Sequence, residues 1–567
     1  MTEKNNGANY IEIPGDLSGK FENTLKNSSG GAIVKRLWER DLSLWKGDAD
    51  LIANRLGWLS LPENTAHSLE KIRDFAARLK DGGIKNVILI AMGGSGLISK
   101  VFARAFADSS DTRLTVIDTT VADTIARVCE NTNWNETFFI VSSKSGATVE
   151  TVSAAAFFFE RCSEKLGADE AAQRFAAITD ENTPLFESAS ERGFAEIFTG
   201  DKTVGGRFSP LSVFGMVPAA IAGADVDAIL SSARDMAREL RGENDNTALN
   251  LAGAIDFFSK NGNGAFHIRC SEAIAGFDRF VEQIVGESLG KDGMRVLPAV
   301  HPVETDCGAG GAFFVCLKDD EKLMAQARAV AESGMPIVIT VLENKNALGG
   351  EIFRWEVAVA ILGALWGINP FDQPDVESAK EQARRLMEIY RREGKLPLNT
   401  ADFTHGKIEF RTSVARSSAD LRAYFEKKAK KKKSGVFFSI QAFLDGSDEK
   451  LRDSVESLRA SLAKTFGVTV TADWGPAYLH SSGQIHKGDA GDGIFIQLCG
   501  KCNSGIKIPG DTPVSGGVEF EILKNAQMLG DREALENVGR EVVQIDLNSD
   551  PAGAIAQISK LLKLTLV

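Results

Sequence analysis

Apolar and polar positions along the chain form patterns that change twice. The first thirty residues carry two turn-rich strings, GDLSG and NSSGG, which indicate a loose lead-in. From about residue 32 to residue 79, apolar side chains recur at the spacing of amphipathic helices. The N-terminal part is therefore predicted to be an irregular stretch followed by helices.

Beyond residue 84 the apolar side chains gather in short continuous runs that alternate with helical patterns. These runs occupy residues 85–92, 114–118, 137–143, 265–270, 312–317 and 337–342. Strands that are apolar throughout and alternate with helices are typical of parallel sheets covered on both faces. We therefore predict an α/β protein with two successive doubly wound parallel sheets, although no residue-level repeat supports a duplication.

A lysine-rich string, KKAKKKK, marks the last change in composition. Apolar runs at 436–443 and 494–498 follow it, with a helical pattern between them, which predicts a third α/β unit. The predicted parts are a helical lead-in over 1–84, a first doubly wound domain over 85–240, a second over 241–425 and a C-terminal α/β unit over 426–567.

Composition and charge exclude several classes of protein. The net charge of −12 argues against a nucleic-acid partner and means that an anionic ligand needs a locally positive pocket. Seven cysteines, an odd and sparse number, fit a reducing compartment better than a disulfide framework. Neither a secretion signal nor an apolar run of about 18 residues is seen, so we expect a cytoplasmic enzyme with no membrane partner.

Two Gly/Ser-rich strings, GGSG and SSKSGAT, directly follow apolar runs, where a parallel strand would end and a helix begin. Free N–H groups at a helix N-terminus and nearby hydroxyls suit a phosphate group. The alternative is a plain strand-to-helix turn, which is stronger for GGSG than for the hydroxyl-rich second string. The candidate ligand contacts are Gly94, Ser95, Ser143, Lys144, Ser145 and Thr148.

The second string resembles the phosphosugar-binding loop of the sugar isomerase domain family, and in particular that of the glucose-6-phosphate isomerases. Four further strings agree with this family in their order: AMGGSGLIS, GGRFSPLS, GESLGK and NPFDQPDVESAK. The string WGPAYLHSSGQIHKG resembles a branch of isomerases fused behind transaldolase in some bacteria, and here no transaldolase segment precedes it. The resemblance runs from about residue 36 to the end. It implies two sugar isomerase domains, interconversion of glucose 6-phosphate and fructose 6-phosphate, and no cofactor.

Matches to the family's motifs imply roles for single residues. Glu287, in GESLGK, matches the base that moves a proton through a cis-enediolate, and Arg207, in GGRFS, matches the arginine that stabilises the enediolate. Lys380 and Gln373 match the segment FDQxxVExxK, and Gln283 matches the glutamine four residues before the base. From residue type alone, Glu287 would be a solvated loop carboxylate and Lys380 an ordinary surface cation.

Histidine is where the sequence departs from the family. The six histidines show no metal-ligand spacing, so a metal-free proton transfer is expected. Most of the family carries a ring-opening histidine soon after the base, but the corresponding stretch here holds only His301. The string HSSGQIHKG resembles that loop in content, so His486 is the first candidate, His480 the second and His301 the third. A structural role is the alternative for each.

Two other functions stay open at this point. One is a phosphoglucose/phosphomannose isomerase of broader specificity, because the residues that admit the 2-epimer cannot be assigned from one sequence. The other is a sugar-phosphate sensor that binds without catalysis. Intact Glu287 and Arg207 argue against the sensor, since sensing needs only the phosphate loop. The resemblance also implies a homodimer in which one subunit completes its neighbour's site.

Overall fold

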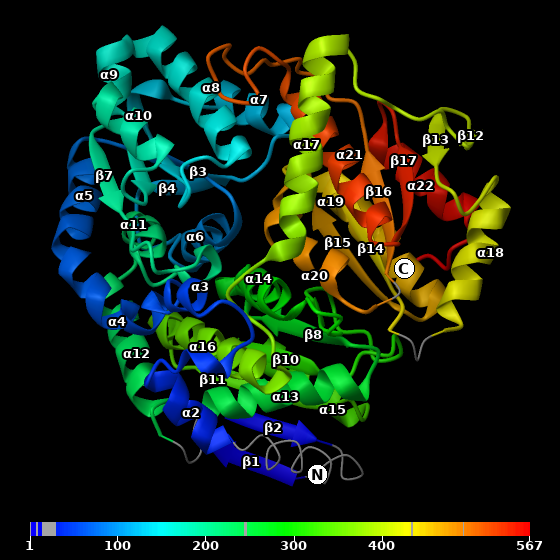
Figure 1. The fold of residues 1–567 in the computed structure, drawn as a ribbon, viewed down its shortest axis with the longest axis horizontal. Coiled ribbons are helices and arrows are strands. Elements are labelled where there is room, and N and C mark those ends of the chain that lie inside the picture. The colour runs from blue at the N-terminus through cyan, green and yellow to red at the C-terminus, as the bar shows by residue number, and fades with distance from the viewer. Residues whose placement is uncertain (1, 7–8, 14–29, 243–245, 432–434, 492) are drawn as a thin grey trace.

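Figure 1 shows three helix-covered sheets in the computed structural model, which describes residues 2–6, 9–13, 30–242, 246–431, 435–491 and 493–567. The first sheet is parallel throughout, with strand order β4-β3-β5-β6-β7. Its strands are β3 (Asn86–Ala91), β4 (Arg113–Ile117), β5 (Thr137–Ser142), β6 (Phe175–Thr179) and β7 (Glu196–Thr199). Its helices are α5 (Leu69–Asp81), α6 (Gly93–Ala105), α7 (Ala122–Glu130), α8 (Val149–Leu166), α9 (Ala168–Gln173), α10 (Pro184–Arg192) and α11 (Val213–Ile221).

The second sheet has strand order β1-β2-β11-β10-β8-β9. Strands β8 to β11 run parallel to one another, and β2 pairs antiparallel with the edge of β11. Its strands are β1 (Thr2–Asn6), β2 (Asn9–Ile13), β8 (Ala265–Cys270), β9 (Leu297–Ala299), β10 (Ala312–Leu317) and β11 (Ile337–Leu342). Its helices are α12 (Val226–Glu239), α13 (Thr247–Asn261), α14 (Phe277–Leu289), α15 (Glu321–Glu332) and α16 (Leu348–Trp366). Both doubly wound sheets confirm the predicted fold class.

The lead-in differs from the prediction at its start. Strands β1 and β2 lie where the sequence indicated loose chain, because the edge of β11 offers unpaired backbone groups that a hairpin can satisfy. The two turn-rich strings fall wholly or mainly on residues 14–29, outside the described residues. The predicted helices before residue 84 are present as α2 (Gly30–Trp38), α3 (Ala49–Ala53), α4 (Leu61–Asn64) and α5.

The C-terminal unit has a third sheet of strand order β12-β13-β17-β16-β14-β15. Its strands are β12 (Phe403–His405), β13 (Ile408–Arg411), β14 (Phe437–Phe443), β15 (Thr469–Trp474), β16 (Ile494–Cys499) and β17 (Glu541–Asp546). Its helices are α18 (Ser418–Ala429), α19 (Glu449–Phe466), α20 (Gly483–Gly488), α21 (Phe520–Asn537) and α22 (Pro551–Leu561). The hairpin β12–β13 joins this sheet although it precedes residue 426, because β13 pairs antiparallel with β17.

Helix α17 (Pro374–Glu393) links the second sheet to the C-terminal unit and packs along α21 (Figure 1). The two helices approach closely at Gly530, where a Cβ atom would lie 2.8 Å from the backbone nitrogen of Ala383. Glycine therefore permits a contact that any side chain would open. The contact holds the C-terminal unit beside the carboxyl ends of β3 and β5.

The apolar runs of the sequence form the buried interior of the protein. Strand β3 buries five of its six residues, as expected for a strand covered on both faces. Helix α16 is largely apolar on all sides, apart from Glu356 and a buried Glu351–Arg354 ion pair, and it packs against α12, α13 and α14. Within the described residues, none of the helices has the length and apolar character needed to cross a membrane.

Candidate active site

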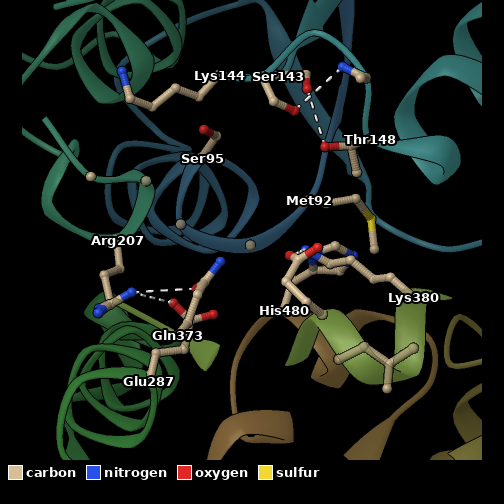
Figure 2. A pocket seen from close by; sticks show the side chains of 18 of the residues that line it. Met92, Ser95, Ser143, Lys144, Thr148, Arg207, Glu287, Gln373, Lys380 and His480 are labelled. Atoms are coloured by element: carbon tan, nitrogen blue, oxygen red, sulfur yellow. Dashed lines mark hydrogen bonds and ion pairs between the residues drawn. The ribbon is translucent and has the colours of Figure 1, made fainter. Parts of the chain in front are cut away.

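A cavity of about 870 Å³ lies at the carboxyl ends of β3 and β5, where open α/β sheets bind their ligands. Its walls come from the first sheet, from α14, from α17 and from the C-terminal turn η9 (Ala477–His480). Figure 2 shows these side chains converging from different elements. The predicted residues that line it are Gly94, Ser95, Ser143, Lys144, Ser145, Thr148, Arg207, Gln283, Glu287, Gln373, Lys380 and His480.

The loop between β5 and α8 has the features of an anion-binding turn. It bends at Gly146, whose φ is +65° and where a Cβ atom would lie 2.8 Å from Thr183 Oγ1. Ser143 Oγ donates to Thr148 Oγ1 at 3.2 Å, and α8 begins directly after the loop. Hydroxyls and the N–H groups of a helix N-terminus therefore line the cavity together, an arrangement suited to phosphate.

Lys144 lines the cavity, but the carboxylate of Asp180 already balances the charge of its ammonium group. Its Nζ lies 2.6 and 2.8 Å from the two carboxylate oxygens of Asp180 and 2.7 Å from the carbonyl oxygen of Asp201. Burial lowers the pKa of Lys144, although the contact with Asp180 opposes this shift. Hydroxyl and backbone donors, rather than this ammonium, are thus available to a ligand in the loop.

The first glycine-rich string brings two loops together. A Cβ atom on Gly94 would lie 2.7 Å from the carbonyl oxygen of Gly206, so glycine lets the 205–207 loop rest against the start of α6. Ser95 follows in the first turn of α6 and lines the cavity. The contact carries Arg207 into the cavity wall.

Hydrogen bonds fix two nitrogens of the Arg207 guanidinium, Nε and Nη2, and the third, Nη1, faces Glu287 and Gln373. Its Nη2 donates to two backbone carbonyls of the 370–372 segment, at 2.6 and 2.9 Å, and its Nε donates to Ser288 Oγ at 2.7 Å. Its Nη1 donates to Glu287 Oε2 and Gln373 Oε1, both at 3.4 Å (Figure 2). A guanidinium fixed in this way is a stationary positive group in the cavity.

Glu287 lies in the last turn of α14, only 5% exposed. Gln283, one turn earlier, donates to Glu287 Oε1 at 3.4 Å and to the carbonyl oxygen of His480 at 2.8 Å. Burial raises the pKa of Glu287 above its ordinary value, while Arg207 limits the rise. A buried carboxylate beside a fixed cation is suited to accept a proton and return it.

Lys380 and Gln373 enter the cavity from α17. Gln373 immediately precedes the helix, and Lys380 lies two turns inside it, 2.8 Å from the carboxylate of Glu377. The predicted surface ion pair is thus present, but its lysine also lines the cavity. Ion pairing and a site position are therefore compatible at Lys380.

His480 is the histidine that reaches the cavity. Its Nε2 lies 3.0 Å from Oε1 of Glu150, a buried carboxylate in the first turn of α8. Burial alone would raise the pKa of Glu150, but His480 and Lys380 bring it below its ordinary value. The pair combines an imidazole with an ionised carboxylate, an arrangement that orients the ring.

His486 and His301, the first and third candidates from the sequence, do not line the cavity. His486 is completely buried, with Nδ1 at 3.2 Å from Gln441 Nε2 and Nε2 at 3.4 Å from Ser439 Oγ. Both partners belong to β14, so α20 turns this side chain toward the sheet. His301 is buried beside Glu456 at 3.2 Å. Of the three candidate histidines, His480, the second choice from the sequence, is therefore the one that lines the cavity.

The cavity residues that the sequence did not single out include Met92, Glu150 and Gln527. Glu150 lies in the first turn of a helix, where acidic residues are common for reasons of helix polarity. Its position two residues after Thr148 is the one signal in the sequence that sets it apart. Met92 ends an apolar run and Gln527 lies within a long helix, so neither gave a signal.

The arrangement can bind an anionic group and move protons. It combines a hydroxyl and amide cradle, a carboxylate of raised pKa beside a guanidinium, and an imidazole–carboxylate pair. In the part of the chain that the structure describes, no group of three or more His, Cys, Asp or Glu side chains is placed to hold a metal ion.

Comparison with known proteins places this site in context. A family model described as phosphoglucose isomerase matches residues 57–295. A glucose-6-phosphate isomerase of Acetivibrio thermocellus is 28% identical over 391 residues, which are 59% of this chain and 87% of the relative. One from Mycoplasmopsis pulmonis is 29% identical over 393 residues, 59% of this chain and 90% of the relative.

Solved structures are similar to this chain in fold. A hypothetical protein from Thermus thermophilus is 26% identical, with a TM-score of 0.57 that covers 66% of this chain and 99% of the other. A glucose-6-phosphate isomerase from Chlamydia trachomatis, 21% identical, has a TM-score of 0.51 over 66% of this chain and 85% of the other, which supports the fold. About a third of this chain lies outside each of these structural matches.

Proposed function

The chain belongs to the phosphoglucose isomerase family, and we propose that it interconverts glucose 6-phosphate and fructose 6-phosphate by a metal-free proton transfer. The observation that carries the proposal is the contact of Glu287 with Arg207 in the cavity that the phosphate loop enters. The reaction needs a base that moves one proton between adjacent carbons and a positive group beside the developing oxyanion. These two residues supply both.

The phosphate group of the substrate binds at the loop between β5 and α8. The hydroxyls of Ser143, Ser145 and Thr148 donate to its oxygens, together with backbone N–H groups at the start of α8. Phosphate contacts are shared by the ground state and the transition state, so the loop sets affinity more than turnover.

Ring opening comes first for the cyclic substrate. A proton must reach the ring oxygen while the hydroxyl on C1 loses its own. We assign the acid to His480, which Glu150 holds at 3.0 Å, and we assign to Lys380 the stabilisation of the proton at the ring oxygen. The glutamines at 283 and 373 hold substrate hydroxyls near the two carbons that react.

Isomerisation follows on the open chain. Glu287 takes the proton from C2 of the aldose, and the electron pair forms the double bond of a cis-enediolate whose negative oxygen faces Arg207 Nη1. The hydroxyl proton on the C2 oxygen moves to the C1 oxygen, and Glu287 returns its own proton to C1, which leaves a carbonyl at C2 and gives the ketose. The raised pKa of Glu287 favours both proton transfers, the abstraction from C2 and the return to C1. A carboxylate with a pKa nearer neutrality both accepts and releases a proton readily.

Cytoplasmic location and a homodimer are further parts of the proposal. Seven free cysteines, six of them buried, suit a reducing compartment. The catalytic groups assigned here all come from one chain, so a dimer would not be required to complete the cavity. Acceptance of the 2-epimer, mannose 6-phosphate, is the remaining variant of the proposal.

A coupled assay on purified protein tests the function. Fructose 6-phosphate and mannose 6-phosphate are each supplied with and without a metal chelator, and formation of glucose 6-phosphate is followed. We expect turnover of fructose 6-phosphate that the chelator does not change. Binding without turnover would identify a sugar-phosphate sensor instead, and loss of activity with chelator would overturn the metal-free mechanism.

A further inference from the structure

Three buried polar side chains and the partly exposed His480 form a continuous hydrogen-bonded chain that ends in the cavity. Thr120 Oγ1 donates to Gln527 Oε1 at 2.8 Å, and Gln527 Nε2 donates to Glu150 Oε1 at 2.6 Å. His480 Nε2 lies 3.0 Å from that same carboxylate oxygen. Thr120, Gln527 and Glu150 are 0%, 3% and 5% exposed, so water does not compete for these bonds.

The chain of bonds crosses between two units at every step. Thr120 follows β4 and Glu150 opens α8, both in the first sheet unit. Gln527 lies on α21 and His480 ends η9, both in the C-terminal unit. The carboxylate that faces the catalytic imidazole is therefore itself held by the unit that supplies the imidazole.

The hydrogen bonds run in one direction, from Thr120 through Gln527 to Glu150. The Thr120 hydroxyl donates to Gln527 Oε1, which leaves the amide nitrogen of Gln527 facing the carboxylate. A carboxylate that accepts from a fixed amide has one preferred position and less freedom to turn. The imidazole beside it is then oriented by a stationary partner.

We propose that Gln527, supported by Thr120, is a positioning residue for ring opening. This inference rests on the proposed role of His480. Gln527 acts in two ways: it fixes the carboxylate that orients the ring, and its N–H dipole offsets part of the negative charge on Glu150. The second effect matters because an imidazolium held too strongly by a carboxylate releases its proton less readily to the ring oxygen.

Other charges act on His480 and remain in place in the test. Glu287 of α14 and the Glu377–Lys380 pair of α17 line the same cavity. Burial raises the pKa of Glu287, and Lys380 lowers that of Glu377, while His480 moves both downward. From α21 the residue that contacts Glu150 is the neutral Gln527, so its replacement changes no formal charge.

Gln527→Met tests the proposal, because it keeps an unbranched side chain and removes the donor. We expect kcat on glucose 6-phosphate to fall about 10-fold while KM stays the same. Losing a donor raises the proton affinity of the imidazole–carboxylate pair, so the alkaline limb of the kcat–pH profile should move to higher pH. Thr120→Val should produce a smaller change in the same direction, and Thr120→Ser, which keeps the hydroxyl, should restore the wild-type profile.

Gln497→Met is the matched control. Gln497 is also a completely buried glutamine of the C-terminal unit, and its Nε2 donates to a buried carboxylate, Asp531, at 3.4 Å, but it does not line the cavity. Gln497→Met should leave the pH profile unchanged. Thermal unfolding of Gln527→Met and Gln497→Met shows whether each is folded at the assay temperature. Equal pH profiles in the two variants would overturn the positioning role.

His480→Ala separates this inference from the function on which it rests. If His480→Ala keeps full activity on cyclic glucose 6-phosphate, the ring-opening role itself fails. If His480→Ala loses that activity while Gln527→Met keeps the wild-type profile, only the role of Gln527 fails. An analogue of fructose 6-phosphate without the C5 hydroxyl cannot close a ring, and its proton exchange with solvent at C1 should be normal in Gln527→Met.

Discussion

Helices α14 and α16 pack against each other, and each buries two glutamates. Two of these carboxyl groups, Glu287 and Glu356, have different surroundings. Glu287 of α14 contacts Arg207 and Gln283 at the edge of the cavity. Glu356 of α16 is completely buried, and neither of its carboxyl oxygens has a hydrogen-bond partner among the described residues. Burial raises the pKa of both groups, and for Glu356 no partner opposes it.

The same contrast separates two histidines of one string. His480 faces Glu150 in the cavity, whereas His486, six residues on, lies inside the C-terminal unit, where burial lowers its pKa to about 4. Residue type and burial are therefore poor guides to a site when taken alone. Access to the cavity and a charged partner distinguish the groups placed for chemistry from the groups that pack the core.

Glu287→Gln should have the largest effect on turnover. It keeps the size of the side chain and one of the two hydrogen bonds that Arg207 and Gln283 donate, but it removes the base, so kcat should fall on the order of 10³-fold or more with little change in KM. Glu356→Gln makes the same chemical change in the core and should leave kcat unaltered. Steady-state kinetics of the two variants measure the contrast, and retained turnover in Glu287→Gln would remove it from the mechanism.

His480→Ala should lower kcat on cyclic glucose 6-phosphate by about 10²-fold, because a positioned general acid contributes that much or more. Proton exchange at C1 of the analogue that cannot close a ring should persist, since Glu287 is intact. His486→Gln is the matched core variant; it should lower the melting temperature and leave kcat near the wild-type value. If His486→Gln instead abolished ring opening in folded protein, the choice between the two histidines would be reversed.

Much of the fold could be predicted from the sequence because its strands are short apolar runs that stand out locally. The runs at 85–92 and 137–143 became β3 and β5 within a few residues. The hairpin β12–β13 was not predicted, because its strands have only three and four residues and show no period. Its place in the third sheet depends on pairing with β17, more than 130 residues later along the chain.

The site was predictable where one local string carries several of its groups. Ser143, Ser145 and Thr148 come from one loop, and Glu287 from another, and all of them line one cavity. The choice between the two histidines of one string was not predictable, because it depends on which way a short helix turns against the sheet. Gln527 was not predicted for a different reason: its partner Glu150 lies 377 positions away along the chain.

Ser145→Ala with Thr148→Ala should raise KM on the order of tenfold or more, with a much smaller change in kcat. Each hydroxyl lost from a doubly charged phosphate removes a charge-assisted hydrogen bond that both states share. Thr151→Val is the core counterpart on the same helix: Thr151 is 1% exposed, and its hydroxyl has no partner among the described residues. It should leave KM unchanged. A double variant that lowered kcat alone would give the loop a different role.

Glu356→Met should have the smallest effect on activity and a measurable effect on stability. A carboxyl buried without a partner costs about 1–3 kcal/mol of folding stability, and an apolar side chain of similar length avoids this cost.

The pKa of Glu356 is raised in the folded state, so the folded protein binds its proton more tightly than the unfolded chain does. Wild-type stability is then greatest below the unfolded glutamate pKa of about 4.3 and falls as pH rises from there toward the folded pKa. The variant lacks this term, so its advantage in melting temperature should widen between about pH 5 and pH 8, a range that starts just above the unfolded pKa. A constant difference across that range would show that Glu356 has partners that keep it ionised, and the contrast with Glu287 would then no longer hold.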